Sequence, residues 1–323
     1  MLGRQRKQQT VIGLDIGSSS VKLVELEVRG REAKLVRFAQ EGIKTKSVAT
    51  AVSGRAVIVK KIWMDRLEQE DARTAIQWEA EQHIPYDIND VALDFQILKS
   101  EPSAKQMEVL LVAAKKDMVL SHADLVREAG LNPEVIDVDA FALQNAVLAN
   151  YEMADDEVAA LINVGAEETN LNIVRAGAPL YTKDIALGTS TLIEGLKRKY
   201  ALGQEEAEGV LNGKAGAADG EIDLPGTVGE VFEDLASAVE RAAAYLKSTG
   251  EAEGVTRIFI AGGGAGITGL CEFLANRQQV EVEVVDPLAR LEIDSERVDA
   301  EKWAAQAPQY SVAVGLALRK VNN

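Results

Sequence analysis

Short runs of valine, isoleucine and leucine open the chain, and glycines or charged residues separate them. Residues 11–17, 21–30 and 33–43 each have this pattern, which is typical of β-strands. A turn rich in glycine and serine, at 17–20, joins the first two runs. The pattern therefore predicts a β-hairpin followed by a third strand.

A block with a different order follows. Its polar and apolar pattern predicts, in sequence, a strand at 55–62, a helix at 68–83, and strands at 91–99 and 107–114. Pro85 ends the helix. One face of this helix carries an apolar stripe, formed by Ala72, Ala75, Ile76 and Ala80. We interpret residues 53–115 as a small strand–helix–strand–strand insert with its own sheet.

The opening pattern then returns. After a helix at 116–130, a strand at 133–139 and a helix at 140–151, residues 157–174 again predict two strands joined by a glycine turn, with a third strand at 178–187. Two such hairpins, each beginning a three-stranded run followed by helices, indicate a duplicated lobe. The natural place for a ligand is between the two lobes.

The remaining elements follow from periodicity and glycine positions. We expect helices at 191–199, 204–211 and 228–248, a loop at 212–229, a strand at 257–261, a helix reaching 276, a strand at 281–285 and a closing helix at 310–319. The fold class is α/β. The predicted divisions are 1–52 and 116–157 for the first lobe, 53–115 for the insert, 158–308 for the second lobe and 309–323 for a closing helix that returns to the first lobe.

Composition limits the classes of function. Hydrophobic residues make up 47% and charged residues 27% of the chain, which is typical of a globular protein in water. The formal charge of −16 argues against nucleic-acid binding, which needs a basic surface, and against direct contact with anionic lipid. We therefore expect any membrane association to pass through a partner protein.

Cysteine and histidine are scarce, with one and two residues. A disulfide framework is excluded within one chain, and too few ligands remain for a zinc cluster. The sequence fits a reducing compartment. It contains no run of about 18 apolar residues, so we expect no membrane span, and the first residues lack the cleavage site of a signal peptide.

The first glycine turn, GLDIGSSSVK at 13–22, has the chemistry of a phosphate loop. Consecutive backbone N–H groups and serine hydroxyls form a concave donor site for phosphate oxygens. Asp15 is placed to hold Mg²⁺ through water, and Lys22 adds a positive charge. The candidate nucleotide-binding residues here are Asp15, Gly17, Ser18, Ser19, Ser20 and Lys22. The alternative is an ordinary hairpin turn with a surface lysine.

Two further glycine turns follow the same logic. The second includes Asn163, Gly165 and Ala166, and on its own it fits a plain hairpin equally well. The third, GGGAG from Gly262 to Gly266, lies between a strand and a helix and allows a flat ring or sugar to lie against bare backbone. Its candidate contacts are Gly262, Gly263 and Gly264. Close strand–helix packing explains two of these glycines but hardly the whole cluster.

Taken in order, the three loops resemble the ATP-binding superfamily of actin, the sugar kinases, the heat-shock chaperones and the division protein FtsA. The resemblance implies an actin-like ATPase fold with ATP and Mg²⁺ between two lobes. It implies that 163–169 is the second phosphate loop and 262–264 the adenosine loop. It also places Asp139 near the position that orients the attacking water, and Glu208 at the position that contacts ribose or adenine.

A closer resemblance rests on AIQWEAEQHIPYDINDVALDFQIL, residues 75–98, and on VIGLDIGSSSVKLVELE, residues 11–27. Both are similar to the PilM family of type IV pilus assembly proteins. This implies an ATP-binding cytoplasmic scaffold, peripheral to the inner membrane, that binds the N-terminal cytoplasmic tail of PilN. Further implied partners are the pilus inner-membrane complex, its motor ATPases and other copies in a ring. We expect Trp63 and Trp78 to anchor the partner, although a second-layer core position explains Trp78 equally well.

The sequence departs from the superfamily at several positions. Asn163 stands where hydrolysing relatives carry an aspartate, and Leu211 stands where many carry a lysine, for which Lys214 is a substitute. The stretch at 43–55 is shorter than in relatives, which carry a helix there. Because hydrolysis needs full charge neutralisation, we expect nucleotide binding with weak or no ATPase activity.

Two alternative functions stay open on sequence alone. One is a polymerising ATPase of the FtsA kind, although no amphipathic helix follows Asn323. The other is a small-molecule kinase, although no base carboxylate stands out in the first lobe.

Overall fold

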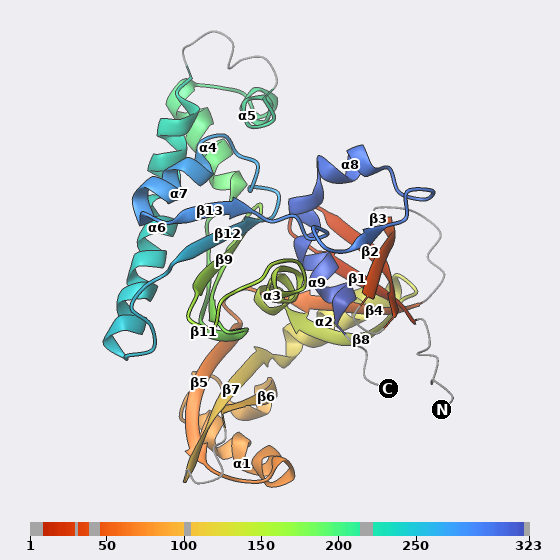
Figure 1. Cartoon of the computed structure of the whole chain (residues 1–323), viewed down its shortest axis with the longest axis vertical. Helices are drawn as coiled ribbons and strands as arrows, with labels where there is room; N and C mark the ends of the chain where they lie inside the picture. The colour runs from red at the N-terminus through yellow and green to blue at the C-terminus, as the bar shows by residue number, and fades with distance from the viewer. Residues whose placement is uncertain (1–8, 30–31, 39–45, 100–104, 214–221, 320–323) are drawn as a thin grey trace.

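The computed structural model describes residues 9–29, 32–38, 46–99, 105–213 and 222–319 (Figure 1). In this part of the chain the strands form three sheets, of six, five and three strands. We call the six-stranded sheet with its helices lobe 1, the five-stranded sheet with its helices lobe 2, and the three-stranded sheet with its helix the insert. The two large sheets lie on either side of a central pair of helices, and the insert extends below them (Figure 1).

The sheet of lobe 1 has the strand order β14-β3-β2-β1-β4-β8. The first three strands in sequence form an antiparallel meander, and the next two pair in parallel. Its strands are β1 (Gln9–Ile16), β2 (Val21–Arg29), β3 (Glu32–Phe38), β4 (Ser47–Val52), β8 (Asn132–Val138) and β14 (Glu292–Ile293).

The sheet of lobe 2 repeats this plan, with the order β11-β10-β9-β12-β13. An antiparallel meander is again followed by two parallel strands. Its strands are β9 (Val158–Val164), β10 (Thr169–Arg175), β11 (Ala178–Ile185), β12 (Arg257–Ala261) and β13 (Glu281–Val284). The correspondence between the orders 3-2-1-4-8 and 11-10-9-12-13 confirms the duplication predicted from the two glycine hairpins.

Two helices lie between the sheets. They are α3 (Asp139–Asn150) and α9 (Ser311–Leu318), and nearly every side chain of α9 is buried. They cross where Gly315 meets Ala142, so closely that a Cβ on Gly315 would lie 1.7 Å from the Ala142 carbonyl oxygen. Only glycine therefore fits at this crossing. Because α3 follows β8 of lobe 1 and precedes β9 of lobe 2, it connects the two lobes.

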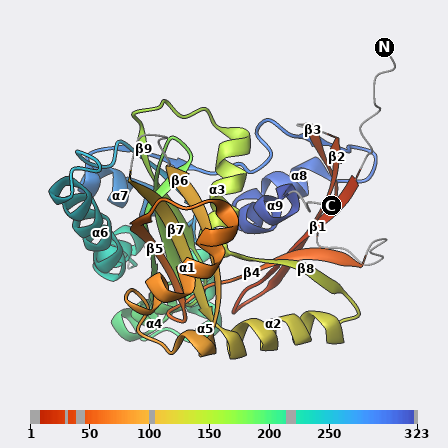
Figure 2. The same ribbon diagram turned by 90° about the horizontal axis from the view of Figure 1, so that it is seen from below.

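The insert leaves lobe 1 after β4 and returns to it before α2 (Lys116–Glu128). Its antiparallel sheet has the order β5-β7-β6, with β5 (Val57–Asp65), β6 (Val91–Lys99) and β7 (Gln106–Lys115). Helix α1 (Gln69–Glu81) covers one face of the sheet, and a short 3₁₀ turn (Ile88–Asp90) follows (Figure 2). The predicted stripe is confirmed in part: Ala72, Ile76 and Ala80 are buried against the sheet, and Ala75 is half-buried beside them.

The opposite face of the insert sheet contacts lobe 2. Lys61 of β5 forms an ion pair with Glu251, which follows the long helix of lobe 2, and lies 3.5 Å from Glu108 on β7. The insert is thus continuous with lobe 1 through the chain and joined to lobe 2 by an ion pair.

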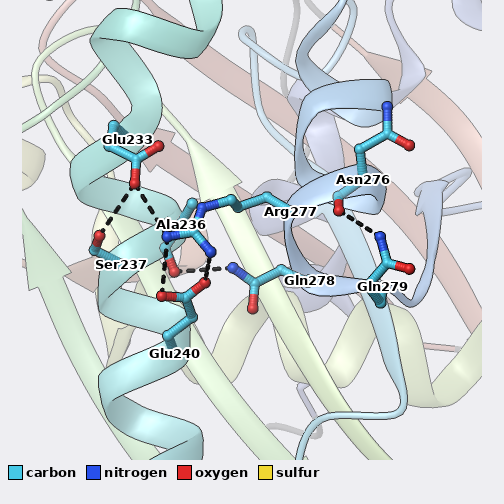
Figure 3. Close-up of polar contacts among 8 residues, drawn as sticks. All are labelled: Glu233, Ala236, Ser237, Glu240, Asn276, Arg277, Gln278 and Gln279. Atoms are coloured by element: carbon cyan, nitrogen blue, oxygen red, sulfur yellow. Dashed lines mark hydrogen bonds and ion pairs between the residues drawn. The ribbon is translucent and has the colours of Figure 1, made fainter.

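Lobe 2 includes the helices α4 (Thr189–Tyr200), α5 (Gln204–Leu211), α6 (Leu224–Ser248) and α7 (Leu270–Gln278). Arg277 of α7 reaches across to α6, where it pairs with Glu240 and lies 3.2 Å from Glu233 (Figure 3). Beside it, the Gln278 side-chain amide donates to the carbonyl oxygen of Ala236, at 2.9 Å. These polar contacts join α7 to α6, whose residues Phe232, Leu235 and Val239 are buried in the apolar core of lobe 2.

The segment after β13 returns to lobe 1 earlier than the predicted boundary at residue 309. Strand β14 pairs in parallel with β3, and α8 (Ala300–Ala304) and a 3₁₀ turn (Ala307–Tyr310) pack on the same side. Trp303 is 2% exposed and lies against Phe38, with ring centroids 5.0 Å apart in an edge-on arrangement. Burial of this tryptophan holds the segment on the sheet of lobe 1.

The structure differs from the sequence predictions at three other places. Residues 47–52, to which the sequence pattern assigned no element, form β4, an interior strand of the lobe 1 sheet between β1 and β8. Helix α6 begins at Leu224, four residues before the predicted start, because Asp223 caps it through the Gly226 N–H. The short elements β14 and α8 were not predicted. The rest of the predicted loop, at 214–221, lies outside the described residues, as does Lys214.

No helix in the described part of the chain is both long and apolar enough to cross a membrane.

Candidate functional site

A cavity of about 330 Å³ lies between the two lobes. Three chain reversals meet at it: the β1–β2 turn, the β9–β10 turn, and the loop that follows β12. Its lining comprises Asp15, Ile16, Gly17, Ser18, Ser19, Ser20, Lys22, Ser53, Asp139, Asn163, Gly165, Ala166, Glu167, Glu168, Asn170, Thr189, Gly262, Gly263 and Gln309. The three glycine turns predicted from sequence therefore come together at one site.

The first turn is closed by a hydrogen bond from the Gly17 N–H to the Ser20 carbonyl oxygen, at 3.1 Å. Asp15 and Lys22 are directly opposite each other in the register of β1 and β2, and Lys22 Nζ lies 3.2 Å from Asp15 Oδ2. Burial raises the pKa of Asp15, and the Lys22 charge opposes that rise. The strand pairing thus places one carboxylate and one ammonium group together at the mouth of the turn.

Asp139 is the first residue of α3 and faces the same cavity. Burial, and then the neighbouring charges of Asp15 and Asp184, raise its pKa to about 7, although a hydrogen bond with Ser53 acts in the opposite direction. A carboxyl group with such a pKa exchanges protons near neutral pH. This places a titratable group beside the first phosphate turn.

The second turn is fixed by the start of α4. The Gly165 N–H donates to the Glu168 carbonyl oxygen at 2.9 Å, and the Thr189 and Ser190 N–H groups donate to the carbonyl oxygens of Gly165 and Ala166. Because the carbonyl oxygens of Gly165 and Ala166 are bonded to α4 and the Gly165 N–H is bonded within the turn, the Ala166 N–H is the backbone polar group of these two residues that is left for a ligand. Such an arrangement suits an anion.

The third turn holds the chain close to β9. Gly262 has a φ of +89°, and a Cβ there would lie 2.4 Å from the carbonyl oxygen of Val164. Gly263 has open space around it and lines the cavity, whereas Gly264 packs on the Val164 side chain outside the lining. Gly262 and Gly264 therefore permit close packing of the backbone, and Gly263 leaves a bare surface.

A chain of hydrogen bonds runs away from the second turn. The Asn163 amide donates to Asn170 Oδ1 at 2.9 Å, and the Asn170 amide donates to Asp184 Oδ1 at 2.8 Å. The second carboxylate oxygen of Asp184 accepts the Gly54 N–H at 2.6 Å. Sequence reasoning missed Ser53, Asn170 and Asp184. A signal was present for Asn170, because β10 (TNLNIVR) carries asparagine at two alternating positions, 170 and 172, and both are buried.

The charges of the cavity are mainly negative. Within the described residues, carboxylates from Asp15, Asp139, Glu167 and Glu168 line it, against the single ammonium group of Lys22. A polyphosphate would be repelled here unless a cation accompanied it. The part of the chain that the structure describes contains no cluster of three or more histidine, cysteine or carboxylate side chains able to hold a metal alone. This arrangement fits Mg²⁺, which keeps several waters and is commonly shared between one or two carboxylates and phosphates.

Several predicted site residues lie elsewhere. Glu208 is exposed on α5, where its carboxylate accepts a hydrogen bond from Gln204, and it does not line the cavity. Its predicted contact with ribose or adenine stays a prediction. Leu211 is half-buried at the end of the same helix.

The two predicted anchor tryptophans are both exposed, Trp63 by 59% and Trp78 by 70%. They lie on opposite sides of the insert. The neighbours of Trp63 in β5, Ile62 and Met64, face α1, so Trp63 points to the other side of the sheet. There it lines a groove of about 490 Å³ that also includes Tyr181 and Tyr245 of lobe 2. Trp78 lies on the outer surface of α1, so it is not a core residue.

Comparison with known proteins shows first to which class of fold the protein belongs. The duplicated lobes around a central cavity have the actin-like ATPase fold. Weaker likenesses were found to other solved structures. These include an archaeal actin homolog, Ta0583 (12% identity, 96% and 98% of the two chains covered, TM-score 0.47), and the ethanolamine utilization protein EutJ from Carboxydothermus hydrogenoformans (16%, 98% and 91%, TM-score 0.46).

A second comparison identifies the protein family within this class of fold. The family model of type IV pilus assembly protein PilM matches residues 34–321, so the chain belongs to the PilM family. A solved PilM–PilN type IV pilus biogenesis complex contains a chain that is similar over 97% of this chain and 99% of its own length, with 26% identity and a TM-score of 0.83. The resemblance read from the sequence is thereby confirmed at the level of the family.

Proposed function

We propose that this type IV pilus assembly protein binds ATP with Mg²⁺ in the cavity between its lobes and acts as a scaffold. The observation that carries the proposal is the meeting of three glycine turns at one cavity, with Lys22 and Asp15 paired at its mouth. In this proposal the backbone donors of 18–20 and of Ala166 hold the phosphates. Lys22 neutralises part of their charge, and Gly263 supports the adenosine.

When bound, Mg²⁺ would neutralise charge between the phosphates and the carboxylates that line the cavity. Asp15 is its nearest candidate ligand, through water, because this carboxylate lies beside the first phosphate turn. Asp139 is positioned to orient a water molecule at the start of α3. Neither Glu208 nor Gly264 lines the cavity, so we propose a nucleotide contact for Glu208 only if α5 moves toward the cavity.

We propose weak or no hydrolysis. Asn163 supplies no negative charge at the position where hydrolysing relatives of the superfamily carry an aspartate. This reduces the ability of the site to hold Mg²⁺ and to balance charge in the transition state. Bound nucleotide would then stabilise the closed lobes by mass action rather than drive a cycle of turnover.

The partner we propose is the N-terminal cytoplasmic tail of PilN, supported by the likeness to a chain of a PilM–PilN complex. The protein would then be cytoplasmic and held at the inner membrane by PilN, within the pilus inner-membrane complex and near its motor ATPases. Assembly of several copies into a ring fits this role. Because Trp63 and Trp78 lie on opposite sides of the insert, one short peptide would use one of them.

Calorimetric titration with ATP tests the proposal, in the presence of Mg²⁺ and then of EDTA. It should be followed by titration with a PilN tail peptide and a phosphate-release assay. We expect saturable Mg²⁺-dependent ATP binding, saturable peptide binding and negligible phosphate release. Rapid turnover would overturn the scaffold role, and absence of any heat of ATP binding would overturn the nucleotide site.

A further inference from the structure

Three polar side chains lie side by side across the strands β9, β10 and β11 of lobe 2. Asn170 of β10 pairs with Asn163 of β9 on one side and with Asp184 of β11 on the other. Because directly paired residues on antiparallel strands point to the same face, the three side chains are adjacent. They form the hydrogen-bond chain described above, with links of 2.9 and 2.8 Å.

The carboxylate at one end gives this chain a direction. A carboxylate only accepts hydrogen bonds, whereas an amide both donates and accepts. Asn170 must therefore turn its NH₂ group toward Asp184 and its oxygen toward Asn163. Asn163 must in turn direct its own NH₂ group toward Asn170. Asp184 thus fixes the orientation of an amide that it does not touch.

The consequence for Asn163 is that its oxygen faces away from Asn170, toward the third glycine turn. A Cβ on Gly262 would lie 2.6 Å from Asn163 Oδ1, so this oxygen sits against the Gly262 backbone at the cavity wall. Asp184 has no freedom to turn away, because its second oxygen accepts the Gly54 N–H at 2.6 Å. Asn163, which lines the cavity, therefore directs its acceptor oxygen, and not its NH₂ group, toward the Gly262 side of the site.

We propose that Asp184 is a positioning residue that acts through Asn170 to present the Asn163 side-chain oxygen to the hydrated Mg²⁺ of the bound nucleotide. The inference rests on the proposed binding of Mg²⁺ and ATP. An amide oxygen can coordinate Mg²⁺ or accept a hydrogen bond from one of its waters, whereas an NH₂ group in the same place would repel the cation. The second phosphate turn then keeps its oxygen donor without adding a further carboxylate to an acidic cavity.

The substitution Asp184→Asn tests whether Asp184 sets the direction of the hydrogen bonds from Asn163 to Asn170 and from Asn170 to Asp184. The new amide at position 184 would keep the Gly54 bond through its oxygen and turn its NH₂ group toward Asn170. Asn170 and Asn163 would both have to reverse, which brings the Asn163 NH₂ group to the cavity. We expect the Mg²⁺ concentration for half-maximal ATP binding to rise about tenfold or more, with ATP affinity in EDTA little changed. Asp156→Asn, which removes an exposed carboxylate elsewhere, is the matched control.

A double exchange makes the test specific. In Asn163→Asp combined with Asp184→Asn, the carboxylate moves to the other end of the chain. The hydrogen bonds can then all form in reverse, with the same net charge as the wild type. We expect both single variants to unfold at lower temperature than the wild type, and the double variant to recover the melting temperature and the Mg²⁺ dependence. Melting is measured without nucleotide, so this readout does not depend on binding.

The outcomes separate the two levels of inference. If the wild-type chain binds no ATP, the proposed function fails, and with it the ligand assigned to Asn163. If the wild type binds ATP but Asp184→Asn has the same Mg²⁺ dependence, only the positioning role is overturned. The positioning role is also overturned if the double variant is no better than the two single variants.

Discussion

Gly315 and Ala142 mark the point where the two central helices touch, with space for a hydrogen atom but not for a methyl group. A Cβ on Gly315 would overlap the carbonyl oxygen of Ala142, which is a backbone atom and cannot swing away. We expect Gly315→Ala to force α3 and α9 apart and to destabilise the folded chain by at least the roughly 1–3 kcal/mol typical of overpacking.

Thermal unfolding checks this expectation. Gly254→Ala is the control, because a Cβ at that position meets no atom within 4 Å. A Gly315→Ala melting temperature equal to those of the wild type and the control would contradict the tight crossing.

Lys22→Ala should weaken ATP binding by about tenfold or more, since it removes the one ammonium group that the described residues contribute to the cavity. The variant also leaves Asp15, a buried carboxylate, without its partner at 3.2 Å, so some loss of stability in the free protein is expected. Calorimetric titration should be compared with Lys60→Ala, which removes an exposed lysine of the insert. Equal ATP affinity in the two variants would refute the assignment of the first phosphate turn.

The raised pKa of Asp139 predicts a dependence of stability on pH. The folded chain holds the Asp139 proton up to a pKa of about 7, whereas the unfolded chain loses it near 3.8. Between these values the folded state binds more protons, so this residue makes the chain less stable as the pH rises from about 4 to 7. Asp139→Asn should remove that loss, and its advantage over the wild type should grow from about pH 4 to about pH 7.

Melting temperatures at several pH values, without nucleotide, measure this effect. The exposed Asp156→Asn serves again as the control for loss of one carboxylate. A constant difference between Asp139→Asn and the wild type across this range would mean that Asp139 titrates at an ordinary pKa.

The tryptophans should respond very differently to truncation. Trp303 is buried between Phe38 and Tyr310, with ring centroids 5.0 and 5.4 Å away, so Trp303→Ala should cost about 3–5 kcal/mol of unfolding free energy. Trp63→Ala and Trp78→Ala remove exposed side chains and should change it by no more than about 0.5 kcal/mol. Denaturant titration measures all three variants. A large loss for Trp78→Ala would mean that this ring is covered in solution.

The same two exposed tryptophans distinguish the faces on which a partner peptide can dock. A PilN tail peptide should lose affinity in Trp63→Ala or in Trp78→Ala, but not in both, because the insert sheet separates the two rings. Fluorescence anisotropy of a labelled peptide measures this directly. Equal losses in both variants would require a partner that wraps around the insert.

Much of the fold could be predicted from periodicity and from the glycine turns, including the duplicated meander and the insert. Strand β4 could not. Its sequence, SVATAV, consists of small residues without polar alternation, because β4 is an interior strand between β1 and β8 and is buried on both faces. Such a strand shows no period of two. The return of the segment 292–304 to lobe 1 was missed for a related reason, since its strand has only two residues.

The candidate site was predictable where it is built from local turns. Gly17, Gly165 and Gly262 lie where the chain must bend tightly, and each carries a local signal. Ser53, Asn170 and Asp184 reach the site only through strand pairing and through the junction with the insert, which no local pattern encodes. Their roles depend on register, and register is a property of the assembled sheet.

The insert belongs to lobe 1 by chain connection, yet it contacts lobe 2 through Lys61 with Glu251 and through the Gly54 N–H with Asp184. Covalent links on one side and polar contacts on the other make the insert a bridge between the two lobes. A hinge motion that opened the cavity would therefore have to break these contacts or carry the insert along. The position of the insert and the separation of the two lobes are thereby linked.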